Sequence, residues 1–148
     1  MAVSITKYTS YVPYVHTGEI NLDDTGKIKL ALVTSGYTFS AAHTIWDPGT
    51  NDAADPSYNE VAAGDGYAAG GVALSGLSVN ATRFDADDAV WTGLTKTFRG
   101  GVLYLNDTYK TIVRPLIAYI LFDTTPNDIV MVGTDFNVTW DASGIITF

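Results

Sequence analysis

The chain has 148 residues and no cysteine, and its 16 acidic and 8 basic side chains give a formal charge of −8. This acidity argues against nucleic acid as a partner, because a phosphate backbone requires a basic surface, and without cysteine there are no disulfides or thiolate metal sites. The longest apolar runs, 116–122 and 144–148, are too short to cross a bilayer, and no secretory signal is evident, so we expect no membrane partner.

The composition favours strands over helices. Charged residues make up 16% of the chain, compared with about 25% in an average globular protein. Lys, Glu and Gln, which fill exposed helix faces, are scarce, whereas Thr, Val, Ile, Tyr, Phe and Gly are plentiful. An all-β domain is the natural inference.

Residues 1–26 are expected to form an N-terminal arm. Tyr8, Tyr11 and Tyr14 recur at a spacing of three, which suits one face of a short helix. Pro13 lacks a backbone donor and is expected to break a helix that runs through it. The arm is therefore predicted to be extended or briefly helical.

Residues 27–33 form the first predicted strand, and a long loop follows it at about 34–66. The strand residues alternate and then become wholly apolar, as in an inner strand. The loop is rich in Gly, Asp, Pro and Asn. It also carries four aromatic residues, Tyr37, Phe39, Trp46 and Tyr58. These argue against disorder, so the loop is expected to pack against a surface.

Six further strands are expected after the loop. They lie at 72–79, 83–91, 95–105, 116–122, 135–140 and 145–148, with polar turns between them. Short, regularly spaced strands without a helical window predict an antiparallel sandwich or barrel. Our preferred fold class is an all-β, antiparallel β-sandwich that is jelly-roll-like, with 27–148 as a single domain.

The segment 64–71 contains four glycines and invites comparison with phosphate-binding loops. No Lys-Ser/Thr pair follows it, and no strand leads through it into a helix. We interpret it as a bend in which glycines permit positive φ angles and close chain approach before the strand that begins near Val72.

Catalysis is not expected, and neither is a cofactor. The histidines, His16 and His43, lie in the arm and the long loop, without H-x-x-x-H spacing or a G-x-S-x-G motif. Asp85, Asp87 and Asp88 have oxygen ligands that suit calcium, but the D-x-D-x-D/N-G loop is absent. We interpret these three acids as solvated turn residues, and weak calcium binding is left open.

Six aromatic residues outside the predicted strands are the candidates for contact with neighbouring subunits. Large aromatic side chains are favoured as interface anchors. The six are Tyr8, Tyr11, Tyr14, Phe39, Trp46 and Tyr58.

Several blocks of the chain resemble small virion structural proteins of tailed bacteriophages, over roughly residues 27–148. The blocks lie at 27–38, 60–74, 84–91, 97–99, 116–119 and 136–145, and include Lys-Ile-Lys-Leu-Ala-Leu-Val at 27–33 and Phe-Asp-Ala-Asp-Asp at 84–88. The resemblance implies a non-enzymatic protein of the virion, which is assembled in the cytoplasm of the bacterial host. Its partners would be the major capsid protein or other virion proteins.

The leading hypothesis is a capsid decoration or cement protein that forms a homo-oligomer, with a trimer favoured. The first alternative is a neck, head-to-tail or tail-associated virion protein. A carbohydrate-binding or glycan-cleaving β-sandwich module is an alternative of another class.

Overall fold

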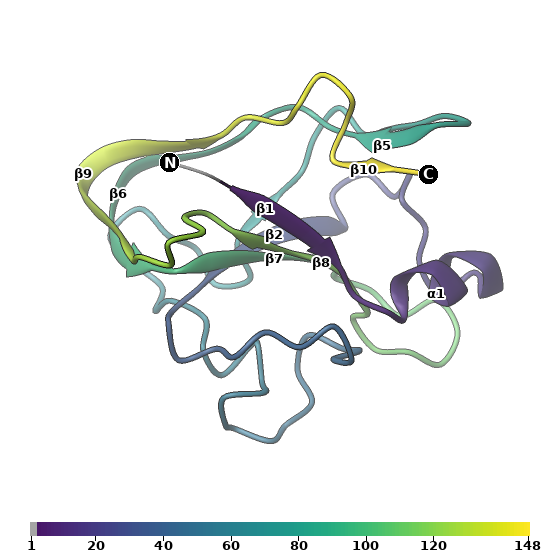
Figure 1. Ribbon diagram of the computed structural model, residues 1–148, viewed down its shortest axis with the longest axis horizontal. Coiled ribbons are helices and arrows are strands. Elements are labelled where there is room, and N and C mark those ends of the chain that lie inside the picture. Colours follow the sequence, from purple (N-terminus) through teal and green to yellow (C-terminus); the bar gives the residue numbers. More distant parts are fainter. Residues whose placement is uncertain (1–2) are drawn as a thin grey trace.

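The computed structural model describes residues 3–148 as a mostly β protein with antiparallel sheets and one short helix (Figure 1). The elements in chain order are β1 (Ser4–Lys7), α1 (Tyr11–Thr17), β2 (Ile28–Val33), β3 (Val72–Ala73), β4 (Ser78–Val79), β5 (Arg83–Asp85), β6 (Ala89–Phe98), β7 (Gly100–Leu105), β8 (Leu116–Leu121), β9 (Ile129–Val138) and β10 (Ile146–Thr147). The described strands do not close into a barrel.

A five-stranded antiparallel sheet in the order β1-β8-β7-β2-β3 is the centre of the molecule. Its inner strands are buried on both faces: successive side chains point to opposite faces of the sheet, and nearly all of them are buried. In β2, Leu30 and Leu32 face the larger core, and Ala31 and Val33 face a second cluster on the opposite side. The apolar run 30–33 at the end of this strand thus reflects two covered faces.

A second layer covers the face of the sheet that carries the larger core. It consists of the β6-β9 pair and a small sheet in the order β10-β5-β4 (Figure 1). Phe98, Phe122 and Phe136 meet between the layers, with ring centroids 4.8–5.7 Å apart. Such aromatic packing, together with the apolar area removed from water, is the main source of cohesion between the layers.

The predicted strands at 27–33 and 116–122 are confirmed as β2 and β8. The predicted strand at 72–79 is divided into β3 and β4, and the one at 95–105 is divided at Arg99, where the chain passes from the second layer into the central sheet. The strand expected at 135–140 begins earlier, at Ile129, because it pairs with β6 along ten residues.

The expectation that Pro13 breaks the helix is wrong. Pro13 is the third residue of α1, which begins at Tyr11. The first backbone N–H groups of a helix have no intrahelical acceptor, so a proline in the first turn removes no hydrogen bond. The helix ends at Gly18, whose φ of 80° gives the left-handed C-cap.

The predicted glycine bend is confirmed, and the long loop packs on the protein as expected. Gly64, Gly66, Gly70 and Gly71 all have positive φ angles. The loop 34–66 runs along the face of the central sheet opposite the second layer (Figure 1). Both faces of the central sheet are therefore covered.

Candidate interaction surfaces

Most of the six aromatic residues expected to contact neighbouring subunits are packed inside this chain. Tyr8, Tyr11 and Trp46 are only 1%, 3% and 2% exposed, and Tyr14 and Phe39 are half-buried against the two core clusters. All six residues lie outside strands, as predicted. However, the loop and the helix that carry them pack against the core, and this buries most of these side chains. Tyr58, which is 62% exposed, is the one of the six with a largely free side chain.

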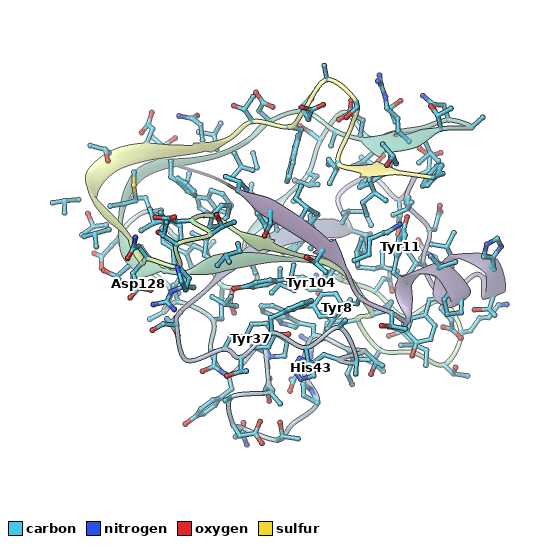
Figure 2. All side chains as sticks on the ribbon, in the orientation of Figure 1. Tyr8, Tyr11, Tyr37, His43, Tyr104 and Asp128 are labelled. Carbon is cyan, nitrogen blue, oxygen red and sulfur yellow. The ribbon has the colours of Figure 1, made fainter. Side chains whose placement is uncertain are left out.

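The aromatic residues of the long loop stack on aromatic residues of the sheet. Trp46 lies on Tyr104 with ring centroids 4.4 Å apart and an interplanar angle of 6°. Phe39 stacks on Tyr119 at 4.8 Å. Figure 2 shows Tyr104, Tyr8 and Tyr37 on this side of the sheet, between the strands and the loop. These contacts attach a loop without strands firmly to the sheet.

A chain of hydrogen bonds runs from this cluster to the edge of the loop. The Tyr8 and Tyr37 hydroxyl oxygens are 3.0 Å apart, and the Tyr37 hydroxyl lies 2.8 Å from His43 Nδ1. A neutral imidazole with Nδ1 unprotonated accepts a hydrogen bond from the Tyr37 hydroxyl, and the Tyr37 oxygen then accepts a hydrogen bond from the Tyr8 hydroxyl. Burial raises the pKa of Tyr37 to about 12, so both hydroxyls remain donors at neutral pH.

This arrangement predicts a stability loss in mild acid. Burial lowers the pKa of His43, and the nearby Asp52 opposes the shift. His43 therefore binds a proton more readily in the unfolded chain than in the folded protein. The contribution of neutral His43 to stability is complete above about pH 6.5 and is lost as the pH falls toward the folded-state pKa. The His43→Asn variant keeps a hydrogen-bond acceptor that does not titrate. Between about pH 7.5 and 5.5, its Tm should therefore decrease less than that of the unsubstituted protein. Equal decreases would contradict the prediction.

Asp55 organises the turn at 51–58, which carries Tyr58. Its carboxylate is fully buried and accepts hydrogen bonds from Ser57 Oγ at 2.7 Å and from the backbone N–H groups of Asn51 and Tyr58 at 3.1 Å. Burial opposes ionisation, but these hydrogen bonds hold the pKa of Asp55 below its usual value. The ionised carboxylate is thus a structural centre of the loop.

A polar cavity of about 350 Å³ lies beside the Trp46–Tyr104 stack, and Lys29, Glu60 and Arg114 contribute to its lining. Glu60 Oε1 accepts hydrogen bonds from the Tyr67 hydroxyl and from the Gly70 N–H, both at 2.6 Å. Burial raises the pKa of Glu60, although both hydrogen bonds and the charge of Lys29 oppose the shift. The carboxyl group thereby fixes the glycine bend to the sheet.

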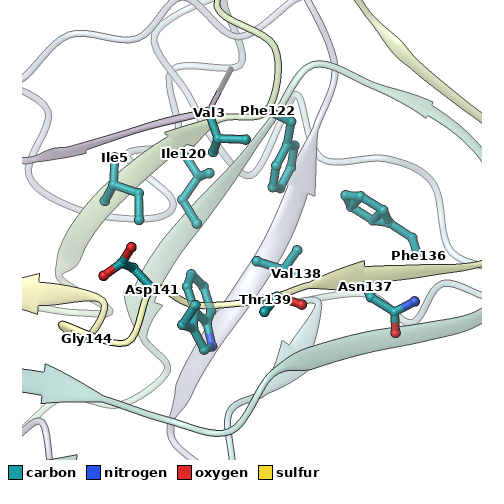
Figure 3. A pocket seen from close by; sticks show the side chains of 11 residues that line it. Val3, Ile5, Ile120, Phe122, Phe136, Asn137, Val138, Thr139, Asp141 and Gly144 are labelled. Atoms are coloured by element: carbon teal, nitrogen blue, oxygen red, sulfur yellow. The ribbon is translucent and has the colours of Figure 1, made fainter. Parts of the chain in front are cut away.

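An apolar groove of about 370 Å³ lies on the open side between the two layers (Figure 3). Val3, Ile5 and Phe122 line one wall, and Phe136, Val138 and Trp140 line the other. A small hollow of about 140 Å³ shares Ile5 with the groove, and through Lys7 it adjoins a further hollow of about 410 Å³ beside α1. The groove is bordered by β1 and β9, and each of these strands pairs on one side only among the described residues.

The two most exposed large apolar side chains in the part of the chain that the structure describes lie on β9. Val130 is 65% exposed and Val132 is 72% exposed. They are separated by one residue, so they point to the same face of the strand. Ile129 and Met131 pack against the larger core, so Val130 and Val132 point away from it, to the outer face of the second layer.

The three acids considered for calcium are used in separate local contacts. Asp85 accepts from the Ala86 N–H, Asp87 from the Ser75 hydroxyl, and Asp88 from the backbone N–H of Trp140. β5 ends at Asp85, so the strand predicted at 83–91 is interrupted before Asp87. Within residues 3–148, no three His, Asp or Glu side chains are grouped in a way that could hold a metal ion. Nor does this part of the chain contain a helix long and apolar enough to span a membrane.

The exposed valines of β9 and the groove are features that the sequence reasoning missed. The available signal was the run 129–134, Ile-Val-Met-Val-Gly-Thr, which is uncharged and rich in β-branched residues. Comparison of the chain with protein-family models, curated proteins and solved structures gave no match.

Proposed function

We propose that this protein is a non-enzymatic structural component of a tailed-bacteriophage particle, where it decorates and stabilises the assembled head. The observation that carries the proposal is the apolar surface along the open side of the molecule, between two unpaired strand edges. Contiguous exposed apolar surface marks sites of association between proteins. The resemblance of residues 27–148 to small virion proteins supports the same conclusion.

The packing of a second β layer on the central sheet supports a finer description of the fold as a jelly-roll-like β-sandwich. In this proposal the central sheet is one layer, and β6, β9 and the small sheet form the other. A sandwich stabilised by burial on both faces of its central sheet provides a rigid body, which suits a part that must resist mechanical load.

The stabilising mechanism is linkage between binding and assembly. A protein that binds the assembled shell but not its free subunits shifts the equilibrium toward the shell by the free energy of its own binding. Apolar contacts across a junction between subunits then oppose the outward pressure of packaged DNA. The charge of −8 suits the outer surface, away from the genome, and discourages aggregation of particles.

The proposal is tested by counting copies of this protein in purified particles of the phage that encodes it. Quantitative gel densitometry against the major capsid protein is expected to give hundreds of copies per particle. About a dozen copies would instead favour the neck or tail alternative. Absence from particles would overturn the proposal, and specific binding on a glycan array would favour the carbohydrate-binding alternative.

A further inference from the structure

The polar cavity beside the Trp46–Tyr104 stack concentrates the scarce basic side chains of this protein. Lys and Arg together number only 8 in the chain, and Lys29 and Arg114 both line this cavity. Its volume of about 350 Å³ falls within the range of ~300–1,000 Å³ that is usual for small-molecule sites. The cavity shares no lining residue with the apolar groove described above, so its charged side chains need a separate explanation.

Lys29 places an ammonium group without an ion-pair partner at the cavity. It lies on β2 with Ala31 and Val33, on the face of the sheet that the loop covers. Its Nζ and the Tyr104 hydroxyl lie 3.4 Å and 3.2 Å from the position that a Cβ on Gly70 would occupy. Lys29 takes part in none of the ion pairs formed among residues 3–148. A half-buried ammonium group of this kind is a favourable position for an anionic ligand.

Arg114 is held beside the same cavity by a strained backbone. Its φ of 49° lies in the left-handed region, which residues other than Gly, Asn and Asp rarely adopt. The Arg114 N–H donates to the Asp107 carbonyl at 3.0 Å, and the Arg114 carbonyl accepts from the Trp46 N–H at 2.9 Å, so the strained conformation is fixed on both sides. The guanidinium donates to Asp47 Oδ2 through Nη2 at 3.0 Å, and its other N–H groups remain for a ligand. Strain of this kind is concentrated at functional sites and ligand clamps.

Glu60 adds an acceptor to this set of donors. Its hydrogen bonds within the described residues are both made to Oε1, so Oε2 is free to accept a hydrogen bond from a ligand. Burial raises the pKa of Tyr104, the charge of Glu60 adds to this shift and the charge of Arg114 opposes it. Both charges therefore act on the hydroxyl that lies beside Lys29. The cavity thus offers several charged donors and one carboxylate oxygen to the same ligand.

We propose that this cavity binds a carboxylate group that carries a neighbouring hydrogen-bond donor, which is the chemistry shared by hydroxy acids and the C-terminal residue of a peptide. The ligand carboxylate accepts hydrogen bonds from Lys29 Nζ and the Arg114 guanidinium, and such charge-assisted bonds are strong. The neighbouring hydroxyl or amide N–H donates to Glu60 Oε2. A carboxylate without this donor meets the negative charge of Glu60 uncompensated, so the donor makes the site selective. The inference does not rest on the proposed function, because the isolated protein contains the whole site.

Titration of the isotope-labelled protein with small acids at constant ionic strength, followed by NMR, tests the site directly. The reporter is the Gly70 amide, whose N–H is bonded to Glu60. We expect N-acetylglycine, which mimics a peptide C-terminus, or L-lactate, which is a hydroxy acid, to shift this amide in a saturable manner at millimolar concentration. N-acetylglycinamide lacks the carboxylate and propionate lacks the hydroxyl, so each should bind at least ~10-fold more weakly than its matched acid, the usual effect of losing a hydrogen bond to a charged group. Which of the two acids binds more tightly identifies a peptide or a metabolite as the source of the carboxylate.

Lys29→Met and Lys27→Met form a matched pair of variants, because each removes one positive charge. Lys27 pairs with Asp107 at 3.3 Å and does not line the cavity. Lys29→Met should weaken binding of the acid by ~10-fold or more, whereas Lys27→Met should change it by less than about 2-fold, since a more distant exposed charge is screened. Circular dichroism verifies that both variants fold, and the comparison of each acid with its matched compound needs no variant at all. The inference would be overturned by the absence of a saturable shift with either acid, by equal binding of the matched compounds, or by equal weakening in the two variants, which is a general effect of charge.

Discussion

Replacement of Trp46 by alanine is expected to lower the free energy of unfolding by about 3–5 kcal/mol, the usual cost of removing a large buried aromatic side chain. Trp46 is 2% exposed and stacks on Tyr104, so the substitution leaves a cavity between the loop and the sheet. The loop contains no strand of its own to compensate for the lost contact. Denaturant unfolding followed by far-ultraviolet circular dichroism measures the change.

The matched control is Tyr58→Ala, in the same loop. Its side chain is 62% exposed, so the free energy of unfolding should change by no more than about 0.5 kcal/mol. A Trp46 variant as stable as the Tyr58 variant would mean that the loop is not held on the sheet by this stack.

Gly71→Ala is expected to destabilise the protein by more than about 3 kcal/mol, or to prevent folding, because two costs combine at this position. The φ of Gly71 is +80°, and an added Cβ would lie 2.0 Å from the backbone oxygen of Leu30 and 2.5 Å from Cα of Ala31. Both contacts are with the backbone of β2, a strand of the central sheet, which cannot move without breaking its pairing. The yield of soluble protein and its thermal unfolding measure the effect.

Gly49→Ala separates the two costs. Gly49 has a similar φ of +71°, but an added Cβ meets nothing within 4 Å. Only the conformational cost remains, about 1 kcal/mol. If both variants were equally stable, the close approach of the glycine bend to β2 would be refuted.

The sequence was sufficient to predict the β-rich class and the strands buried on both faces. Residues 30–33 and 116–122 are continuous apolar runs, which are typical of strands buried on both faces. The beginning of β9 at Ile129 was not predictable in the same way, because it depends on pairing with the whole length of β6. A brief helix in the arm was among the predicted possibilities, but Pro13 was wrongly expected to break it, because the effect of proline depends on its position within the first turn.

The candidate interface was harder to predict than the fold. An aromatic residue in a loop is an interface anchor only if the loop leaves it exposed, and whether Trp46 or Tyr58 is exposed is decided by contacts with distant strands. Local sequence carries little information about such contacts. By contrast, the uncharged run at 129–134 was visible in the sequence, but its importance depends on β9 lying at an edge.

The pairing of β1 with β8 has a consequence for biosynthesis. Ser4–Lys7, near the beginning of the chain, pairs with residues 118–121, near its end. During translation the ribosome must therefore complete most of the polypeptide before its earliest strand finds its partner, and a topology dominated by such distant contacts folds slowly. The central sheet is thus expected to be completed only after residues 118–121 have emerged from the ribosome.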